Sequence, residues 1–291
     1  MNIKNPINSL NSFYKRVSLL KSADVLGIVK TGFEDGEVYV ELENGLKFYG
    51  PPTRKKLYKY HKFLSRRLKE IVKVECLNIV YDIIIRYHER GLKIHGPKKE
   101  LFYTPKEGDI IAEMGAFMGY YTVYLSKIIG ENGKIIAIEP IEDNLYYLRL
   151  NVEKNKLNNV LIVPKGVWNK PDKMVFYKKE DDHQSASLVL SSENKNKLEF
   201  EVDCLDNILN EANTKHVDFM IIQLNGVEYE ALEGLNIVKP KNLSIAARYD
   251  SGTEKTSRKI LNLLENRGYF VKLVEEEYVF AELKCKEYEK K

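Results

Sequence analysis

The chain has 291 residues, of which 44% are hydrophobic and 30% are charged, and its formal net charge is +4. This composition supplies a sizeable core and argues against disorder, and the length suits a Rossmann-type domain with a smaller appendage. The three cysteines show no Cys-x-x-Cys spacing, so we predict neither a metal site nor a disulfide framework. Because no apolar run is long enough to span a bilayer, we expect a soluble, cytoplasmic protein.

The first hundred residues differ in pattern from the rest. Apolar residues alternate from Glu37 to Phe48, with Asn44-Gly45 between the two arms. Asn-Gly accepts the positive φ angles of a type I′ turn, so this stretch is predicted to form a β-hairpin. We predict that residues 1–100 form a small α+β region that caps the substrate site.

A strongly basic segment, Arg54 to Lys73, follows the hairpin. Apolar residues recur in it every three or four positions, which predicts one amphipathic helix. The segment carries nine basic residues against one acid, Glu70. Such a surface suits the phosphates of a nucleic acid, an anionic membrane surface or a phosphorylated glycan carrier. Alternatively, it is a solvated face held in place by its leucine stripe.

From Gly108 onward, short apolar runs alternate with helical segments, which predicts a parallel sheet with helices on both faces. Strands are expected at Ile110–Met114, Lys134–Glu139, Asn159–Pro164, Val217–Leu224 and Leu243–Arg248, and helices at Tyr120–Ile129, Ile141–Asn155, Glu228–Leu232 and Thr256–Asn266. An antiparallel pair is expected at Tyr269–Val274 and Tyr278–Leu283, and an inserted hairpin or edge strands at Met174–Tyr177 and Glu199–Val202.

The chemistry-bearing motif is Glu113-Met-Gly115-Ala-Phe-Met-Gly119, between a predicted strand and a predicted helix. Gly115 allows a tight turn and close approach of the backbone to a ligand, and Gly119 lets the helix start against the sheet. Glu139 ends the second strand, where an acid can accept hydrogen bonds from both ribose hydroxyls of an adenosine. Only Gly-x-x-x-Gly is present, which favours an adenosine without a pyrophosphate, as in S-adenosyl-L-methionine (SAM). The alternative is a plain strand-to-helix turn in which Glu139 caps the next helix.

The stretch from about Lys106 to Gly234 resembles the FkbM family of SAM-dependent methyltransferases. The matching residues are Glu113-Met-Gly-Ala-Phe-Met-Gly-Tyr-Tyr-Thr122, Ala137-Ile-Glu-Pro140, Asn144 with Leu148 and Asn151, Asp203-Cys-Leu-Asp206, and Asn225-Gly-Val-Glu-Tyr-Glu-Ala-Leu-Glu-Gly234. The resemblance implies the class I methyltransferase fold, an α/β architecture whose seven-stranded, mostly parallel sheet ends in an antiparallel hairpin. It assigns SAM as the cofactor and residues 101–291 as the SAM-binding domain.

The resemblance, together with the motif, predicts the cofactor site. Its expected residues are Glu113, Gly115, Ala116, Gly119, Tyr120, Glu139, Pro140, Asn144, Gly166, Val167 and Gln223. The backbone of Gly166-Val167 follows the third strand, where class I enzymes contact the adenine. One of Tyr120 and Tyr121 is expected to face the cofactor or the acceptor, and we assign Tyr121 to the substrate.

The sequence departs from the family at the fourth strand. The family motif Lys-Ile-Asp-Val-Glu-Gly-Ala-Glu is replaced here by Ile221-Ile-Gln-Leu-Asn-Gly-Val-Glu228. Two carboxylates have become the amides Gln223 and Asn225, which cannot take a proton near neutral pH. An alcohol is a poor nucleophile until its proton is removed or shared, so this change bears directly on the reaction.

Other side chains are candidates for the missing base. His183 titrates in the right range, although it also suits an exposed loop. Glu228 matches the last acid of the family motif, although a carboxylate at a helix start is also a plain N-terminal charge. Asp250 follows the fifth strand beside Arg248, which could hold an anionic group of the substrate or form a surface ion pair. We assign His183, Glu228 and Gln223 to catalysis, and Asn225, Arg248 and Asp250 to the substrate.

Three functions follow. The first is O-methylation of a hydroxyl on a sugar, a glycolipid or a small metabolite. The second is methylation of RNA or a protein, guided by the basic segment. The third is a non-catalytic SAM-binding module, suggested by the amides Gln223 and Asn225.

Overall fold

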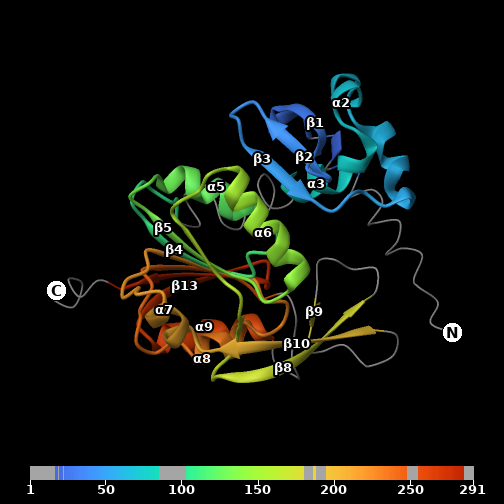
Figure 1. Ribbon diagram of the computed structural model, residues 1–291. Coiled ribbons are helices and arrows are strands. Elements are labelled where there is room, and N and C mark those ends of the chain that lie inside the picture. Colours follow the sequence, from blue (N-terminus) through green and yellow to red (C-terminus); the bar gives the residue numbers. More distant parts are fainter. Residues whose placement is uncertain are drawn as a thin grey trace.

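The computed structural model describes residues 17–18, 20–21, 23–84, 103–179, 186–187, 195–247 and 255–284 (Figure 1). Its largest sheet has seven strands in the order β13-β14-β12-β11-β4-β5-β6. These strands are β4 (Ile110–Met114), β5 (Lys134–Ile138), β6 (Val160–Val163), β11 (Phe219–Ile222), β12 (Asn242–Ala246), β13 (Tyr269–Val274) and β14 (Tyr278–Leu283). The first five pair in parallel, whereas β14 pairs antiparallel with both β12 and β13. The predicted fold class is confirmed.

Helices cover both faces of this sheet (Figure 1). One face carries α5 (Tyr120–Ile129) and α6 (Glu142–Lys154), and the other carries α7 (Leu205–Glu211), α8 (Glu228–Glu233) and α9 (Thr256–Asn266). The strand residues are buried on both sides, as expected where helices cover both faces of a parallel sheet. No helix in the described part of the chain is both long and apolar enough to cross a membrane.

A second, smaller sheet follows β6 in the chain. Its order is β7-β10-β8-β9, formed by β7 (Gly166–Val167), β8 (Asp172–Lys179), β9 (Ala186–Ser187) and β10 (Lys195–Asp203). The inserted hairpin predicted from Met174–Tyr177 and Glu199–Val202 is confirmed, because β8 and β10 pair antiparallel with Phe200 opposite Met174.

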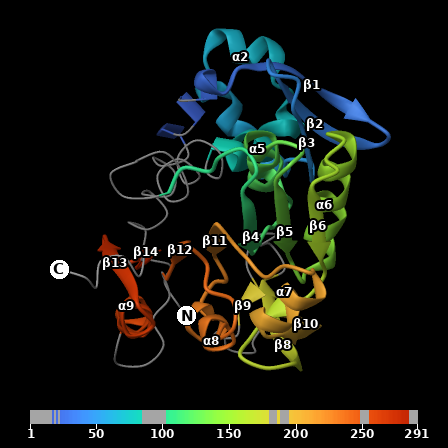
Figure 2. The same cartoon turned by 90° about the vertical axis from the view of Figure 1, so that its left-hand side faces the viewer.

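The N-terminal region is a three-stranded antiparallel sheet wrapped by short helices (Figure 2). Its elements are η1 (Ala23–Leu26), β1 (Ile28–Glu34), β2 (Glu37–Leu42), β3 (Lys47–Gly50), η2 (Lys55–Phe63), α2 (Arg66–Ile71), η3 (Val74–Cys76) and α3 (Leu77–Ile83). The predicted hairpin is present as β2 and β3. The predicted type I′ turn was wrong, because such a turn needs positive φ at both central residues and only Gly45 (φ 80°) has it. In the turn, the N–H of Gly45 donates to the carbonyl of Leu42.

The single helix predicted from Arg54 to Lys73 was also wrong. The segment is a 3₁₀ helix, η2, followed by the short helix α2, and Leu64 between them is extended with ψ 155°. Ser65 starts the second helix, because its hydroxyl accepts a hydrogen bond from the N–H of Leu68 at 3.2 Å. The periodic pattern predicted helical spacing correctly and missed the serine that divides it.

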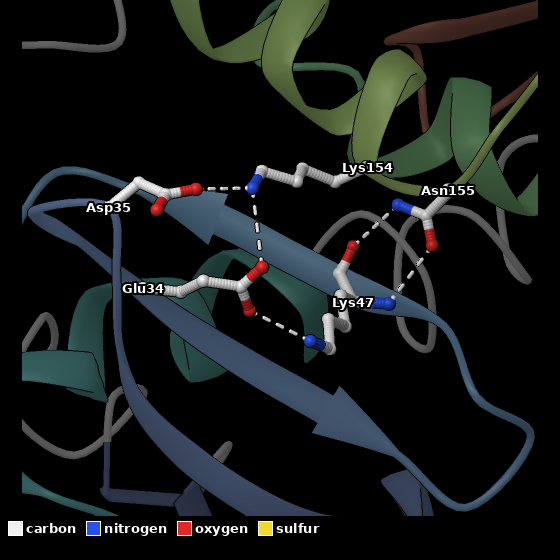
Figure 3. A network of polar contacts seen from close by, with 5 residues as sticks. All are labelled: Glu34, Asp35, Lys47, Lys154 and Asn155. Carbon is white, nitrogen blue, oxygen red and sulfur yellow. Dashed lines mark hydrogen bonds and ion pairs between the residues drawn. The ribbon is translucent and has the colours of Figure 1, made fainter.

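Two asparagines, one in α6 and one at its C-terminal end, hold the outer edge of β3. Asn151 accepts from the N–H of Tyr49 (2.7 Å) and donates to the Tyr49 carbonyl (2.9 Å) and to the Met118 carbonyl (2.8 Å). One helical turn on, Asn155 makes the same pair of bonds to Lys47 (Figure 3). Four helical residues and two strand residues both rise about 6–7 Å, so the two amides match alternate residues of the strand edge. The N-terminal sheet is thereby joined to the seven-stranded main sheet through α6.

An ion network covers the same contact (Figure 3). Glu34 of β1 accepts from Lys47 at 2.8 Å and from Lys154 at 3.2 Å, and Lys154 also reaches Asp35 at 2.6 Å. The two ammonium groups, Lys47 first, lower the pKa of Glu34 to about 2 from its ordinary 4.5. The carboxylate therefore favours the folded state only while it is charged.

This pKa shift predicts a pH-dependent contribution to stability. The stabilisation from Glu34 is expected above about pH 4.5 and lost as the pH falls toward 2. Because Glu34 is about a third exposed, solvent screening limits the effect to roughly 1 kcal/mol or less. Unfolding of the native chain and of Glu34→Gln should differ at pH 7 and converge at pH 2. A difference that stays constant across this range would contradict the assignment.

Candidate functional site

The candidate site lies where the strand order of the main sheet reverses. From β4 the chain proceeds outward to β5 and β6, and it returns to the other side of β4 at β11. The carboxyl ends of β4 and β11 are therefore adjacent at a switch point, which is where ligands bind in such sheets. The N–H of Gln223 donates to the carbonyl of Met114 at 3.1 Å, so the two loops leave the sheet side by side.

The glycine loop after β4 is shaped by left-handed residues. Gly115 (φ 81°), Phe117 (φ 55°) and Gly119 (φ 78°) all have positive φ. A Cβ at Gly115 would lie less than 3.0 Å from the backbone carbonyl oxygen of Gln223, whereas one at Gly119 would meet the flexible end of the Leu148 side chain. The approach of a neighbouring backbone therefore requires glycine at position 115, a reason that the sequence did not reveal, and the positive φ favours glycine at position 119.

Glu139 ties the glycine loop to the start of α6. Its Oε2 accepts from the N–H of Phe117 at 2.9 Å, and its Oε1 accepts from the N–H of Ile141 at 3.1 Å and from Nδ2 of Asn144 at 3.0 Å. Only 4% of Glu139 is exposed. The carboxylate therefore lies at the carboxyl edge of the sheet, as predicted. It also caps the start of α6, which was the alternative role predicted for Glu139.

Asn144 offers an unused acceptor beside this carboxylate. Its residue is 2% exposed, its Nδ2 donates to Glu139, and its buried Oδ1 has no hydrogen-bond partner in the described structure. A buried acceptor without a donor is costly, and such groups are normally satisfied by protein, water or a ligand. Ribose hydroxyls are donors, so the Asn144 and Glu139 oxygens fit an adenosyl group. SAM would be held by these two side chains and the glycine loop.

Other predicted cofactor residues have structural partners. Glu113 is buried, and its Oε2 accepts from the hydroxyl of Thr122 at 2.6 Å. Tyr120 is 1% exposed and packs edge-to-face on Phe48 of the N-terminal sheet. Tyr121 stacks on Tyr124 within the core of the main sheet. Both tyrosines therefore pack against other aromatic rings. Their predicted contacts with cofactor and substrate stay predictions.

Gly166 and Val167 lie in β7, where they pair in parallel with β10. The Val167 side chain belongs to the core under α7 and α8. Ala116 lies within the glycine loop, where its N–H donates to the carbonyl of Ile138 at 3.1 Å, and Pro140 follows Glu139. The predicted adenine contact at Gly166-Val167 stays a prediction.

The loop after β11 wraps around Glu228. The Glu228 carboxylate accepts from the N–H of Leu224 at 3.0 Å and from that of Gly226 at 3.1 Å, and the residue has no exposed surface. Burial raises the pKa of Glu228 above its ordinary value. These contacts hold Asn225 at φ 58° and Gly226 at φ 112°. Glu228 thus shapes the loop that carries Asn225, and the geometry does not support it as a base in contact with substrate.

Gln223 and Asn225 are half-buried at the switch point, with backbones fixed by β4 and by Glu228. Three other predicted site residues, His183, Arg248 and Asp250, lie outside the described residues. Within the described part of the chain, no group of three or more His, Cys, Asp or Glu side chains is placed to bind a metal ion.

Residues 109–271, more than half of the chain, match the family model described as the methyltransferase FkbM domain. The chain belongs to the FkbM methyltransferase family. The resemblance predicted from the sequence motifs is confirmed. The family assignment and the seven-stranded sheet identify a class I, SAM-dependent methyltransferase domain.

Two curated methyltransferases match parts of the chain. The chain is 31% identical over 105 residues to a protein-L-isoaspartate O-methyltransferase of Methanococcus maripaludis, covering 35% of this chain and 47% of that protein. It is 40% identical over 57 residues, 20% of the chain, to a probable cobalt-precorrin-6B C(15)-methyltransferase of Sulfurisphaera tokodaii, of which it covers 30%. The chain thus spans less than half the length of these curated relatives.

Solved methyltransferases also resemble the chain at low identity. A methyltransferase FkbM from Methylobacillus flagellatus KT is 17% identical with a TM-score of 0.45, and the match covers 72% of this chain and 54% of the other. A SAM-dependent methyltransferase from Aquifex aeolicus is 23% identical with a TM-score of 0.39, over 67% of this chain and 94% of the other.

Proposed function

We propose that this FkbM protein uses SAM to methylate a hydroxyl group of a sugar, a glycolipid or a small metabolite. The observation that supports the cofactor half is the buried, unused Oδ1 of Asn144 beside the carboxylate of Glu139 at the switch point. Bound SAM supplies an electrophilic methyl group on a sulfonium. The protein's part is to fix the adenosyl group through these oxygens and to keep the glycine loop in place through Glu139.

The acceptor is expected beside Gln223 and Asn225. Their amides can donate and accept hydrogen bonds, so they can orient a hydroxyl, but they cannot remove its proton. Because the Glu228 carboxylate accepts hydrogen bonds from backbone N–H groups, the remaining candidates for the base are the His183 imidazole and the Asp250 carboxylate. We also propose that the protein is cytoplasmic.

Calorimetry with SAM and with its demethylated product tests the cofactor site. Asn144→Leu is expected to weaken binding about tenfold or more, because a hydrogen bond to a buried acceptor is worth roughly 1–2 kcal/mol. Asn207→Leu is the control, since Asn207 also donates to a carboxylate, that of Asp203, from helix α7. Absence of heat with either compound on folded protein would contradict the proposal, as would equal weakening by the two variants.

Labelled SAM tests the acceptor. After incubation with a lysate, the label should enter small molecules or glycolipids rather than RNA or protein. The amides specifically favour a second candidate, a SAM-binding module without turnover. In Gln223→Asp with Asn225→Glu, lower turnover would show that the amides suit the native acceptor. Turnover that appears only in this double variant would support the non-catalytic module.

A further inference from the structure

Three large apolar side chains of η1 and β1, which lie beside helix α2, are exposed. Val25 is 61% exposed, Val29 is 46% exposed and Phe33 is 56% exposed. They are three of the seven large hydrophobic residues that are exposed in the described structure, and all lie within nine residues of sequence. Figures 1 and 2 both place β1 and α2 on the side of the molecule away from α7, α8 and α9. Three exposed apolar side chains so close in the sequence, beside a basic helix, favour a contact with another phase or molecule.

Helix α2 and the segment that follows it place cations beside these apolar positions. Arg67 donates to the carbonyl of Ile28 at 3.2 Å, and it lies 4.0 Å from the carboxylate of Asp24. Lys73 places its ammonium 5.4 Å from the centre of the Phe33 ring. The side chain of Thr31 bonds both to the Ile71 carbonyl (2.7 Å) and to the N–H of Lys73 (3.0 Å), so β1 and the end of α2 are fixed side by side.

The charge of this surface is mainly positive. Lys30, Arg66, Arg67, Lys69 and Lys73 are exposed on it, against the exposed acids Asp24 and Glu70. Two further acids at the end of β1, Glu34 and Asp35, are paired with Lys47 and Lys154. Asp24 is partly neutralised by Arg67. The neighbouring helix η2 adds four exposed lysines, Lys55, Lys56, Lys59 and Lys62, and it is joined to the end of α2 by His61, whose Nε2 lies 2.7 Å from the Val72 carbonyl.

We infer that this surface docks the protein on an anionic lipid bilayer. Its apolar side chains enter the boundary between headgroups and acyl chains, while its lysines and arginines contact anionic headgroups. The two valines argue against RNA, because an aliphatic side chain neither binds a phosphate nor stacks on a base. This inference goes beyond the proposed function and does not depend on it, since docking requires no cofactor.

Vesicle flotation of the full chain without SAM tests the inference. Binding is expected to phosphatidylcholine vesicles that contain phosphatidylglycerol, to fall with added salt, and to be weak on phosphatidylcholine alone. Phe33→Ser should weaken binding about tenfold or more, because it removes one large apolar side chain from the bilayer. Lys69→Gln with Lys73→Gln should weaken it on anionic vesicles.

Phe270→Ser is the matched control. Phe270 of β13 is 57% exposed and has Lys284 at 5.1 Å from its ring, so it repeats the exposure and the cation contact elsewhere on the molecule. Its substitution should leave vesicle binding unchanged. Equal loss in the Phe33 and Phe270 variants would overturn the inference, as would no vesicle binding together with single-stranded RNA binding that needs Lys69 and Lys73. Self-association lost in Phe33→Ser, without vesicle binding, would assign the surface to a second copy of the chain.

Discussion

Replacement of Asn151 by alanine is expected to lower the free energy of unfolding by about 3–5 kcal/mol. Asn151 has no exposed surface, and its amide satisfies the N–H and carbonyl of Tyr49 and the carbonyl of Met118. Its loss leaves three backbone groups without partners at a contact that water does not reach, and each unsatisfied group costs roughly 1–3 kcal/mol, not fully additively. Denaturant unfolding measures the effect: the midpoint should fall, while the slope of the free energy of unfolding against denaturant concentration stays the same.

Asn155→Ala provides the comparison for this prediction. Asn155 bonds to Lys47 in the same way but is only partly buried, so water can replace its amide. We expect a loss of about 1–2 kcal/mol. Hydrogen exchange should also separate the variants, with the Tyr49 amide deprotected in Asn151→Ala and the Lys47 amide in Asn155→Ala. Equal losses in the two variants would show that burial does not set the strength of this contact.

The sequence predicted the main sheet well because its signals are local. Helix Thr256–Asn266 and strands Tyr269–Val274 and Tyr278–Leu283 have the predicted bounds. Helical periodicity and short apolar runs bounded by turns carry this information within one segment. The helix Leu205–Glu211 was not predicted, although Asp206 in its first turn matched the family motif.

The N-terminal region was harder to predict because distant residues stabilise it. Phe117, Met118 and Tyr120 of the glycine loop and α5 belong to the same core as the N-terminal sheet. No periodicity in residues 1–100 indicates this contact. Asn151 was noticed as part of a family motif, but only the structure shows that its amide bonds to β3, about a hundred residues earlier in the chain.

The site residues show a similar division. Position at the carboxyl edge of the sheet follows from strand order, so the placement of Gly115, Glu139 and Gln223 could be predicted. The partner of a carboxylate could not, because Glu139 and Glu228 each accept from backbone N–H groups whose positions depend on tertiary structure. A sequence motif therefore identified the loops and left the roles of their acids open.

Gly115→Ala is expected to destabilise the protein by roughly 3–5 kcal/mol and to abolish SAM binding. Any Cβ at φ 81° carries a left-handed backbone cost of about 1–2 kcal/mol. At Gly115 the new methyl group also meets the Gln223 carbonyl, which is backbone and can move only if β11 moves from β4. That displacement would separate the two loops of the candidate site, so ligand binding should fail even in protein that remains folded at low temperature.

Gly108→Ala measures the backbone part of this effect alone, so the difference between the two variants gives the steric part. Gly108 has φ 83°, nearly the same backbone conformation, yet a Cβ there would meet no atom within 4 Å. This variant should lose about 1–2 kcal/mol and bind SAM normally, because only the backbone cost applies. Thermal unfolding and calorimetry on both variants check the pair. If Gly115→Ala were no less stable than Gly108→Ala and bound SAM equally well, the close approach of the β4 and β11 loops could not be what requires a glycine at position 115.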